Sequence, residues 1–344
     1  MNIFSLPPDH RPLLIAEISA NHGGSLERAK NLIKLASTHG ADAVKIQSYE
    51  PDTMTIDGNQ EHFQIKSGLW AGQTLHSLYT SAQTPFSWHS DLFKFAKSID
   101  VELFSTPFDD SAVDLLETLG TPYYKIASFE LTDVHLLARV AQTKKGVILS
   151  TGMSSIEDIE NALDVFSEYE RSQIVLLHAT SSYPAPLEDS NLRLIPELKR
   201  RFGVRVGLSD HTLGNKASIA AIALGASLIE KHFTDDRDVP TADSSFSAQP
   251  EEFLELAQDM GRVHAALGDG SFTRPPSENQ SLVFRRSLMY ARDMSSGSVL
   301  AEQDIVRMRP GFGLKPIDRN VVIGQKLKSS VKRGDYLEWA QIEK

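Results

Sequence analysis

The sequence predicts an α/β fold in which a (β/α)8 TIM barrel is followed by a small C-terminal β domain. Across the first 270 residues, short β-branched runs alternate eight times with amphipathic helical stretches. The first run lacks the glycine-rich phosphate turn that an open, doubly wound sheet would carry. Beyond residue 285, short apolar runs are broken by Ser-Gly, Pro-Gly and Arg-Gly pairs, which is typical of turns between strands.

Eight successive βα units favour a closed parallel barrel, because each crossover places the next strand beside the previous one. A helical pattern follows each strand. In the stretch 25–40, for example, Ala29, Leu32, Ile33 and Ala36 share one face. The predicted strands are 13–19, 43–49, 101–108, 123–130, 146–153, 174–182, 204–212 and 227–234.

The chain is predicted to divide into a barrel at 1–270, a linker at 271–284 and a β domain at 285–344. The stretch 269–279, where the linker begins, is rich in Gly, Ser and Pro. Within the barrel, the segment from about 50 to 85 is long and contains its own apolar residues, including Leu69 and Trp70. Loops of this kind commonly cover a binding site, and a loop after a barrel strand lies at the active mouth.

Composition excludes several classes of protein. The chain has no cysteine, which rules out disulfides, thiolate zinc sites and a cysteine nucleophile. No basic leader and no run of 18 apolar residues is present, so we expect a cytoplasmic protein with no membrane partner. The net charge of −10 argues against nucleic-acid binding. It is unevenly distributed: residues 285–344 hold 12 Lys or Arg against 7 Asp or Glu, a balance of +5, and the rest carries −15.

Polar residues close nearly every predicted strand, although a buried parallel strand does not need them. Active sites of TIM barrels collect at this face, and an unpaired charge inside a strand is costly. We therefore expect these residues to share one site. They are Glu17, Lys45, Gln47, Ser105, Thr106, Lys125, Ser128, Glu130, Ser150, Thr151, His178, Thr180, Ser181, Ser209, Asp210, His211, Lys231 and His232.

Three lysines of this set, Lys45, Lys125 and Lys231, are expected to face one cavity in an acidic domain. A small polyanion such as a phosphate ester with a carboxylate would neutralise them. Salt bridges to Glu17 or Glu130 are the structural alternative. Lys125 alone allows another reading, a Schiff-base aldolase.

His211 and His232 close adjacent strands and form a candidate pair of nitrogen ligands for a divalent cation, with Glu17 or waters completing the shell. Two histidines without cysteine suit a catalytic Mn²⁺ or Mg²⁺ with open positions better than a structural zinc.

With these residues placed, the chain resembles the sialic acid synthase family over nearly its full length. The tail, with Arg285-Arg-Ser287 and Arg309-Pro-Gly-Phe-Gly-Leu314, is similar to the antifreeze-protein-like (SAF, β-clip) domain that ends those enzymes. The barrel motifs are Ile15-Ala-Glu-Ile-Ser-Ala-Asn-His22, Ala43-Val-Lys-Ile-Gln47, Phe104-Ser-Thr-Pro-Phe108, Tyr124-Lys-Ile-Ala-Ser128, Leu149-Ser-Thr-Gly-Met153, Gly207-Leu-Ser-Asp-His-Thr212 and Ile229-Glu-Lys-His232.

Within the family, the chain looks most like the branch that makes pseudaminic acid, on Gly68-Leu-Trp-Ala-Gly72, Thr84-Pro-Phe-Ser-Trp-His89 and Phe129. This resemblance implies a 2,4-diacetamido-trideoxy hexose as acceptor, with Leu69 and Trp70 over its methyl group. An N-acetylneuraminate or legionaminate synthase is the alternative inside the family. Outside it stand the aldolase on Lys125 and a non-catalytic carbohydrate-binding protein.

The resemblance also implies roles for individual residues and a reaction between phosphoenolpyruvate and an amino-sugar aldehyde. Glu17 would handle a proton. A divalent cation (Mn²⁺, Mg²⁺ or Co²⁺) would sit on His211 and His232. Sugar binding falls to Gln47, Tyr183, Asp243 and Arg309, the last reaching the partner's barrel in a domain-swapped homodimer. Phosphoenolpyruvate binding falls to Lys45, Thr106, Lys125, Ser128, Ser150, Ser181 and Ser209. Ser181 departs from the family pattern, in which many members have asparagine.

Overall fold

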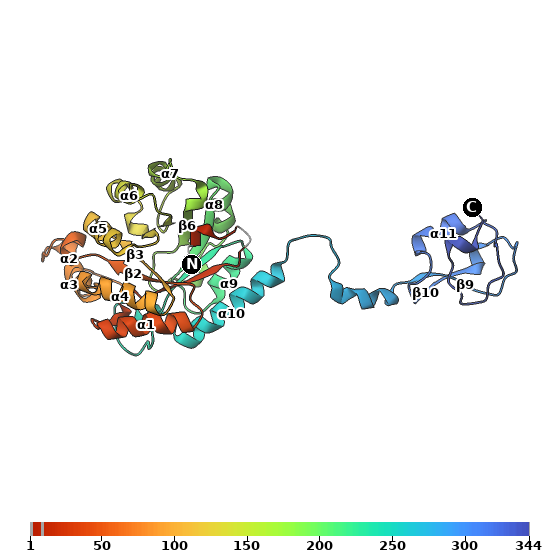
Figure 1. The fold of residues 1–344 in the computed structure, drawn as a ribbon, viewed down its shortest axis with the longest axis horizontal. Coiled ribbons are helices and arrows are strands. Elements are labelled where there is room, and N and C mark those ends of the chain that lie inside the picture. Colours follow the sequence, from red (N-terminus) through yellow and green to blue (C-terminus); the bar gives the residue numbers. More distant parts are fainter. Residues whose placement is uncertain (1–2, 8–9, 344) are drawn as a thin grey trace. The chain divides into compact units, whose positions relative to one another are not determined.

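The computed structural model describes residues 3–7 and 10–343. The chain divides into two compact units, residues 1–268 and 269–344. Their helices and strands are labelled in Figure 1, and each unit is described by itself.

The first unit is a closed barrel of eight parallel strands, which confirms the predicted fold class. Each strand pairs with the next along the chain, and the last pairs with the first through Glu17 and His232. The strands are β1 (Leu13–Glu17), β2 (Ala43–Ser48), β3 (Glu102–Pro107), β4 (Tyr124–Ile126), β5 (Val147–Ser150), β6 (Ile174–Ala179), β7 (Arg205–Asp210) and β8 (Leu228–His232).

All eight strands are shorter than their predicted runs. β4 shows the reason most clearly: pairing stops at Ile126, and a 3-10 turn, Ser128–Glu130, follows within the predicted run. The polar residues after each strand therefore leave the sheet and belong to the loops of the active face.

A helix follows each strand and covers the outside of the barrel (Figure 1). In the first helix, the Ser25 side chain accepts a hydrogen bond from Arg28 N at the N-terminus, and the face of Ala29, Leu32, Ile33 and Ala36 is buried as predicted. These helices are α1 (Leu26–Thr38), α4 (Phe86–Ser98), α5 (Asp110–Leu119), α6 (Val134–Ala141), α7 (Ile156–Val165), α8 (Leu194–Phe202), α9 (Lys216–Ala223) and α10 (Pro250–Leu267).

Side chains alternate between the inside and the outside of the barrel, because successive residues of a strand point to opposite faces. The outward residues pack with the helices into the larger core. The inward residues nearest the strand starts form a second apolar cluster, which includes Leu13, Phe104, Tyr123 and Leu228. Ile3, from a short 3-10 turn before β1, packs against this cluster and is 2% exposed. The floor of the barrel is therefore closed, and its polar layer lies at the other end.

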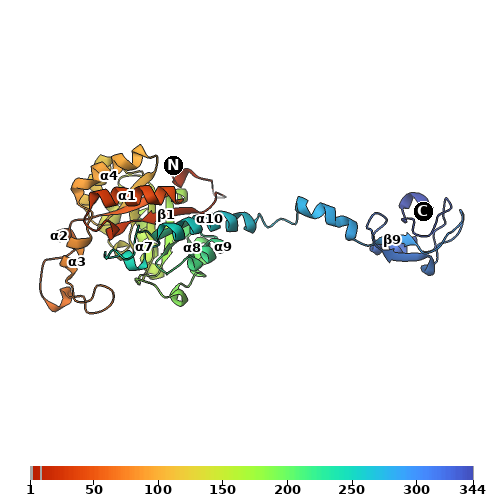
Figure 2. The ribbon, with the colours of Figure 1, turned by 90° about the horizontal axis from the view of Figure 1, so that it is seen from below.

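The long segment between β2 and α4 is structured. It contains α2 (Pro51–Met54), α3 (Leu75–Ala82) and a small hairpin between them, and Figure 2 shows the region around α2 and α3 in orange. Gln64 and Thr74 pair in antiparallel fashion at the base of this lid hairpin (residues 64–74). Its turns use Gly68 and Gly72, whose φ values of 84° and 91° favour glycine.

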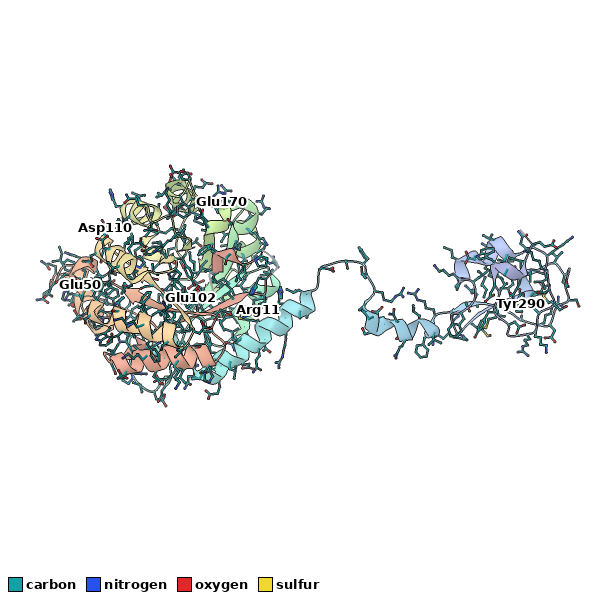
Figure 3. All side chains as sticks on the ribbon, viewed as in Figure 1. Arg11, Glu50, Glu102, Asp110, Glu170 and Tyr290 are labelled. Atoms are coloured by element: carbon teal, nitrogen blue, oxygen red, sulfur yellow. The ribbon has the colours of Figure 1, made fainter. Side chains whose placement is uncertain are left out.

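The second unit contains one antiparallel pair, β9 (Ser287–Tyr290) with β10 (Ile305–Met308), and the short helix α11 (Arg319–Val322). Its own apolar core includes Leu288, Leu300 and Leu337. Tyr290, labelled in Figure 3, lies in this core, and its hydroxyl donates to Gln341 Oε1 at 3.1 Å. In the part of the chain that the structure describes, none of the helices has the length and apolar character needed to cross a lipid bilayer.

Candidate active site

A small cavity of about 50 Å³ opens among the carboxyl ends of the barrel strands. This is the face where TIM barrels hold their active sites. Most of the predicted site residues line it together: Glu17, Lys45, Gln47, Thr106, Lys125, Ser128, Ser150, Tyr183, Ser209, His211 and His232.

Two lysines and two carboxylates form the polar layer at the bottom of the cavity. Lys45 pairs with Glu17, and its Nζ lies 3.5 Å from Glu230 Oε2. Lys125 Nζ lies 3.2 Å from Glu230 Oε1, which also accepts from Ser209 Oγ at 3.0 Å. All four charged residues are buried. Two positive and two negative groups balance one another here, which is the condition for burying them.

The two carboxylates differ in their environments. Burial would raise the pKa of Glu230, but Lys125 and Lys45 outweigh it and hold the pKa at about 2. Burial raises the pKa of Glu17, and Lys45 opposes this only in part. Neighbouring carboxylates with separated pKa values divide into a permanent anion and a proton carrier. Here Glu230 is the anion and Glu17 the proton carrier.

Lys125 has a lowered pKa of about 8, because burial and the nearby Lys45 charge disfavour its ammonium form while Glu230 favours it. Lys125 therefore holds its proton less firmly than an ordinary lysine does.

Glu230 is a site residue that the sequence analysis missed, although it lies in the motif Ile229-Glu-Lys-His232. Strand alternation was the available signal. Glu230 and His232 are two residues apart, so both face the cavity, whereas Lys231 between them faces outward.

The prediction that Lys231 joins the other two lysines in the cavity is therefore wrong. Its Nζ donates to Asp210 Oδ2 at 2.9 Å and to the Thr212 carbonyl at 2.8 Å. Asp210 also accepts from Ser218 Oγ of α9, on the outside of the barrel. This buried pair joins β7 and β8 and takes no part in the site.

Two other predicted strand-end residues also point away from the cavity. His178 Nε2 bonds to the Ser190 carbonyl at 2.6 Å, behind β6. Ser105 bonds to Ser48 Oγ at 2.6 Å, and Ser48 in turn bonds to His89 Nε2 at 2.7 Å. Thr151 and Thr180 also lie outside the cavity lining, because their hydroxyls donate to the Leu177 and Asp189 carbonyls. One shared site thus explains the inward-facing residues, and hydrogen bonds to neighbouring strands, loops and helices explain the others.

Three hydroxyls gather around the turn after β5. Gly152 N donates to Ser128 Oγ at 3.0 Å. A Cβ on Gly152 would lie 2.2 Å from Ser181 Oγ and 2.8 Å from Ser128 Oγ, so glycine is required there. The hydroxyls of Ser150 and Ser181 are buried without a hydrogen-bond partner among the residues described. Buried hydroxyls without partners are unusual in a finished core and are available to a bound anion.

His211 and His232 lie side by side at the rim, with ring centroids 5.5 Å apart. Burial lowers the pKa of His211 to about 4 and that of His232 further, so both rings are neutral. His211 Nδ1 donates to the Thr180 carbonyl at 2.8 Å, which leaves Nε2 with its lone pair. His232 Nδ1 has no hydrogen-bond partner within the described residues and lies 3.9 Å from Asp243 Oδ2.

These donors fit a metal that keeps open positions. Neutral imidazoles with free lone pairs are the form that binds cations. Within residues 3–7 and 10–343, no group of three or more His, Cys, Asp or Glu side chains forms a closed site. The pair would therefore share a cation with waters or substrate oxygens.

Tyr183 and Asp243 lie beside the histidines, beyond the strand ends. The Tyr183 ring is 4.4 Å from that of His211. Asp243 accepts a hydrogen bond from Ser19 Oγ, and burial raises its pKa. Phe129 lines the cavity and is 58% exposed. Arg309 belongs to the C-terminal unit, where it is exposed.

Glu130 is a further acidic group near the mouth, and the sequence analysis gave it no catalytic role. One of its carboxylate oxygens is buried without a hydrogen-bond partner in the described part of the chain. Burial raises its pKa to about 7, against the opposing charge of Lys125. A carboxyl group with a pKa near neutrality is a candidate for proton transfer.

Comparison with known proteins follows the same division of the chain. The model of the NeuB family matches residues 32–272, and the model of the SAF domain matches residues 285–343. The chain is 40% identical over 338 residues to the pseudaminic acid synthase of Campylobacter jejuni, covering 98% of each. It is 38% identical to that of Helicobacter pylori (97% and 98% covered) and 35% identical to the N,N'-diacetyllegionaminic acid synthase of Legionella pneumophila (96% and 94%).

Solved structures agree with these relatives. The N-acetylneuraminic acid synthetase of Leptospira borgpetersenii, in complex with citrate, is 32% identical with a TM-score of 0.71, and the match covers 79% of this chain and 90% of that one. A putative spore coat polysaccharide biosynthesis protein E of Chromobacterium violaceum has a TM-score of 0.79 at 26% identity, covering 97% and 100%. The resemblance seen in the sequence motifs is confirmed: the chain belongs to the NeuB family and ends in a SAF domain.

Proposed function

We propose that this protein is a pseudaminic acid synthase. It condenses phosphoenolpyruvate with 2,4-diacetamido-2,4,6-trideoxy-altrose and water, giving pseudaminic acid and phosphate. The observation that carries the proposal is one cavity that holds anion-binding lysines and hydroxyls beside two neutral histidines and a proton-carrying carboxylate. The similarity to pseudaminic acid synthases over 98% of the chain supports this choice of acceptor.

The reaction joins C3 of phosphoenolpyruvate to the aldehyde carbon of the open-chain sugar. The aldehyde oxygen takes a proton and becomes a hydroxyl. Water adds at C2, and phosphate leaves from the tetrahedral carbon as its C–O bond breaks, so the product carries a keto group at C2.

Lys45 and Lys125 bind the carboxylate and phosphate of phosphoenolpyruvate, assisted by Thr106 and Ser209. Each lysine already has a carboxylate partner, so the ligand joins an ion-pair network and need not supply the whole countercharge. The hydroxyls of Ser128, Ser150 and Ser181 lie where a phosphate group can use them.

Glu17 moves the proton of the attacking water or of the tetrahedral intermediate. Its raised pKa and its position at the end of β1, above the closed floor, suit that task. Glu130, with a pKa near 7, is a second group able to exchange a proton at the mouth.

A divalent cation, Mn²⁺, Mg²⁺ or Co²⁺, would be held by His211 and His232. When bound, it supplies Lewis-acid polarisation of the aldehyde oxygen. Thr180 orients the His211 ring for this task through its carbonyl, and Asp243 faces His232.

Gln47, Tyr183 and Asp243 hold the acceptor sugar, and Phe129 meets its apolar edge. Arg309 reaches the sugar from the SAF domain of a partner chain in a domain-swapped homodimer, an assignment that rests on the family resemblance. The reaction takes place in the cytoplasm, with phosphoenolpyruvate and the amino sugar as the protein's small-molecule partners.

Phosphate release tests the proposal directly. The purified protein is assayed with phosphoenolpyruvate, a panel of amino sugars and Mn²⁺, with and without EDTA. We expect release only when phosphoenolpyruvate, sugar and metal are all present, with the 6-deoxy diacetamido sugar preferred over N-acetylmannosamine. A preference for N-acetylmannosamine would indicate an N-acetylneuraminate synthase, and a preference for the legionaminate precursor would indicate a legionaminate synthase. Full activity in EDTA, with no metal bound to the protein, would reject the proposed dependence on a divalent cation.

The metal ligands have a separate test. His232→Ala should keep the fold and lose bound Mn²⁺, as measured by metal analysis of the dialysed protein. Equal metal content in variant and parent would remove His232 from the ligand set.

A Schiff-base aldolase on Lys125 is the second candidate, and the lowered pKa of that lysine favours it. Borohydride reduction in the presence of substrate would trap a covalent adduct on Lys125. The synthase proposal predicts no adduct and loss of activity with EDTA.

A further inference from the structure

The lid hairpin (residues 64–74) lies against the barrel rim through Trp70. Trp70 Nε1 donates to the Ala242 carbonyl at 2.9 Å, across 172 positions of sequence. The Trp70 ring lies 5.7 Å from that of Tyr183. In residues 3–7 and 10–343, this is the one hydrogen bond between the hairpin and the loops after β6 and β8.

Both contacts fall at the sugar end of the cavity. Tyr183 lines the cavity and packs against His211. Ala242 is bonded to Asp243, whose carboxylate faces His232. Trp70 therefore touches two loops that supply the proposed acceptor contacts.

Backbone hydrogen bonds hold the base of the hairpin, and Trp70 attaches its tip to the barrel rim. Ile65 N donates to the Gln73 carbonyl and Gly72 N to the Ile65 carbonyl, both at 2.9 Å. Leu69 at the tip is 46% exposed. A tip with one polar attachment and turns built on glycine can swing as a unit once that attachment opens.

We propose that Trp70 is a latch and a positioning residue for acceptor binding: its indole N–H bond to Ala242 holds the lid hairpin against the rim, and its ring supports Tyr183, which lines the cavity. The inference rests on the proposed function for the identity of the acceptor. The latch itself is a property of the fold.

Two substitutions separate the hydrogen bond from the ring. Trp70→Phe removes the donor and keeps an aromatic ring beside Tyr183, whereas Trp70→Ala removes both. With the donor lost, KM for the acceptor should rise about two- to tenfold, the usual effect of one neutral hydrogen bond. Trp70→Ala should raise it further. KM for phosphoenolpyruvate should stay within about twofold in both. Ile56→Ala is the control, because Ile56 is an exposed apolar residue of the same segment.

Hydrogen exchange tests the latch without substrate. In Trp70→Phe, peptides covering 64–74 and 240–244 should exchange faster than in the parent, and peptides from the barrel strands should not. Unchanged exchange together with an unchanged acceptor KM would overturn the proposal, as would equal rises in both KM values.

The two measurements also separate this inference from the proposed function. Faster exchange in a protein that releases no phosphate with any amino sugar would reject the proposed function and keep the latch. If the protein is an active synthase but Trp70→Phe changes neither hydrogen exchange nor the KM for the acceptor, the proposed function stands and the latch is rejected.

Discussion

Glu17 and Glu230 border the same lysine, yet their pKa values move in opposite directions. Glu230 has two ammonium groups and a serine hydroxyl around it, whereas Glu17 has mainly Lys45 and the backbone N–H of Ser19 to offset its burial. Both carboxylates are equally buried, so their charged neighbours, rather than depth in the barrel, separate the two pKa values.

This difference predicts the effect of Glu17→Gln. The amide still accepts from Ser19 N but cannot carry a proton, so the fold and phosphoenolpyruvate binding should persist while turnover falls about a hundredfold or more. Phosphate release measures turnover, and calorimetry measures phosphoenolpyruvate binding. Near-parental turnover would remove Glu17 from the mechanism.

The buried carboxyl of Glu130 predicts a pH dependence of stability. Its folded pKa of about 7 lies above the unfolded value, so the native state binds more protons than the unfolded state and loses stability as pH rises through this window. Glu130→Gln removes the titration. Its melting temperature relative to the parent should therefore be higher at pH 8 than at pH 5.

Scanning calorimetry at the two pH values makes this comparison. The control is Glu255→Gln, which makes the same charge change at an exposed position of α10. If both variants show the same pH dependence, the effect does not come from the burial of Glu130.

At the scale of elements, the eight strands, their order and the buried faces of the helices could be predicted from the sequence. Short buried strands and amphipathic helices each leave a strong pattern of apolar residues. The facing of individual side chains was not predicted. Asp210 and Lys231 carry charges at strand ends as Lys45 and Lys125 do, and only their place in the alternation puts them outside. A shift of one residue reverses the facing of a side chain, and the early end of β4 was not visible from composition.

The turn after β5 offers a test at this scale. In Gly152→Ala the new methyl group would displace Ser181 and Ser128, so KM for phosphoenolpyruvate should rise about tenfold or more, the scale of one lost hydrogen bond to a charged group. Steady-state kinetics measures this. The matched control is Gly261→Ala in α10, where a Cβ meets nothing within 4 Å. Equal KM values in both variants would mean that the hydroxyl cluster does not bind the phosphate.

At the scale of the whole molecule, the chain joins an acidic barrel to a basic domain. Residues 285–344 carry a balance of +5 and the rest of the chain −15, so the proposed exchange of C-terminal domains would bring opposite charges together. The proposed exchange of these domains between chains can be tested by complementation.

Glu17→Gln and Arg309→Ala chains, each inactive alone, should regain about a quarter of parental activity when mixed in equal amounts. Random exchange makes half of the dimers mixed, and one of the two sites in each mixed dimer carries neither change. Co-purification of differently tagged chains establishes that exchange took place. No recovery despite exchange would show that each domain serves its own barrel.

The closed floor of the barrel sets the route that molecules must take. Among the residues that the structure describes, Ile3 and the apolar layer around Phe104 and Tyr123 close the centre of the barrel, so the substrates and products of the proposed reaction would share the opening at the rim. The proposed phosphate-binding residues Lys45 and Lys125 lie on β2 and β4, whereas Tyr183 and Asp243, two of the proposed sugar contacts, lie on loops beyond the strand ends. A bound sugar therefore covers the way to the deeper site. If the proposed function holds, phosphoenolpyruvate is expected to bind before the sugar, and phosphate to leave after the sugar product.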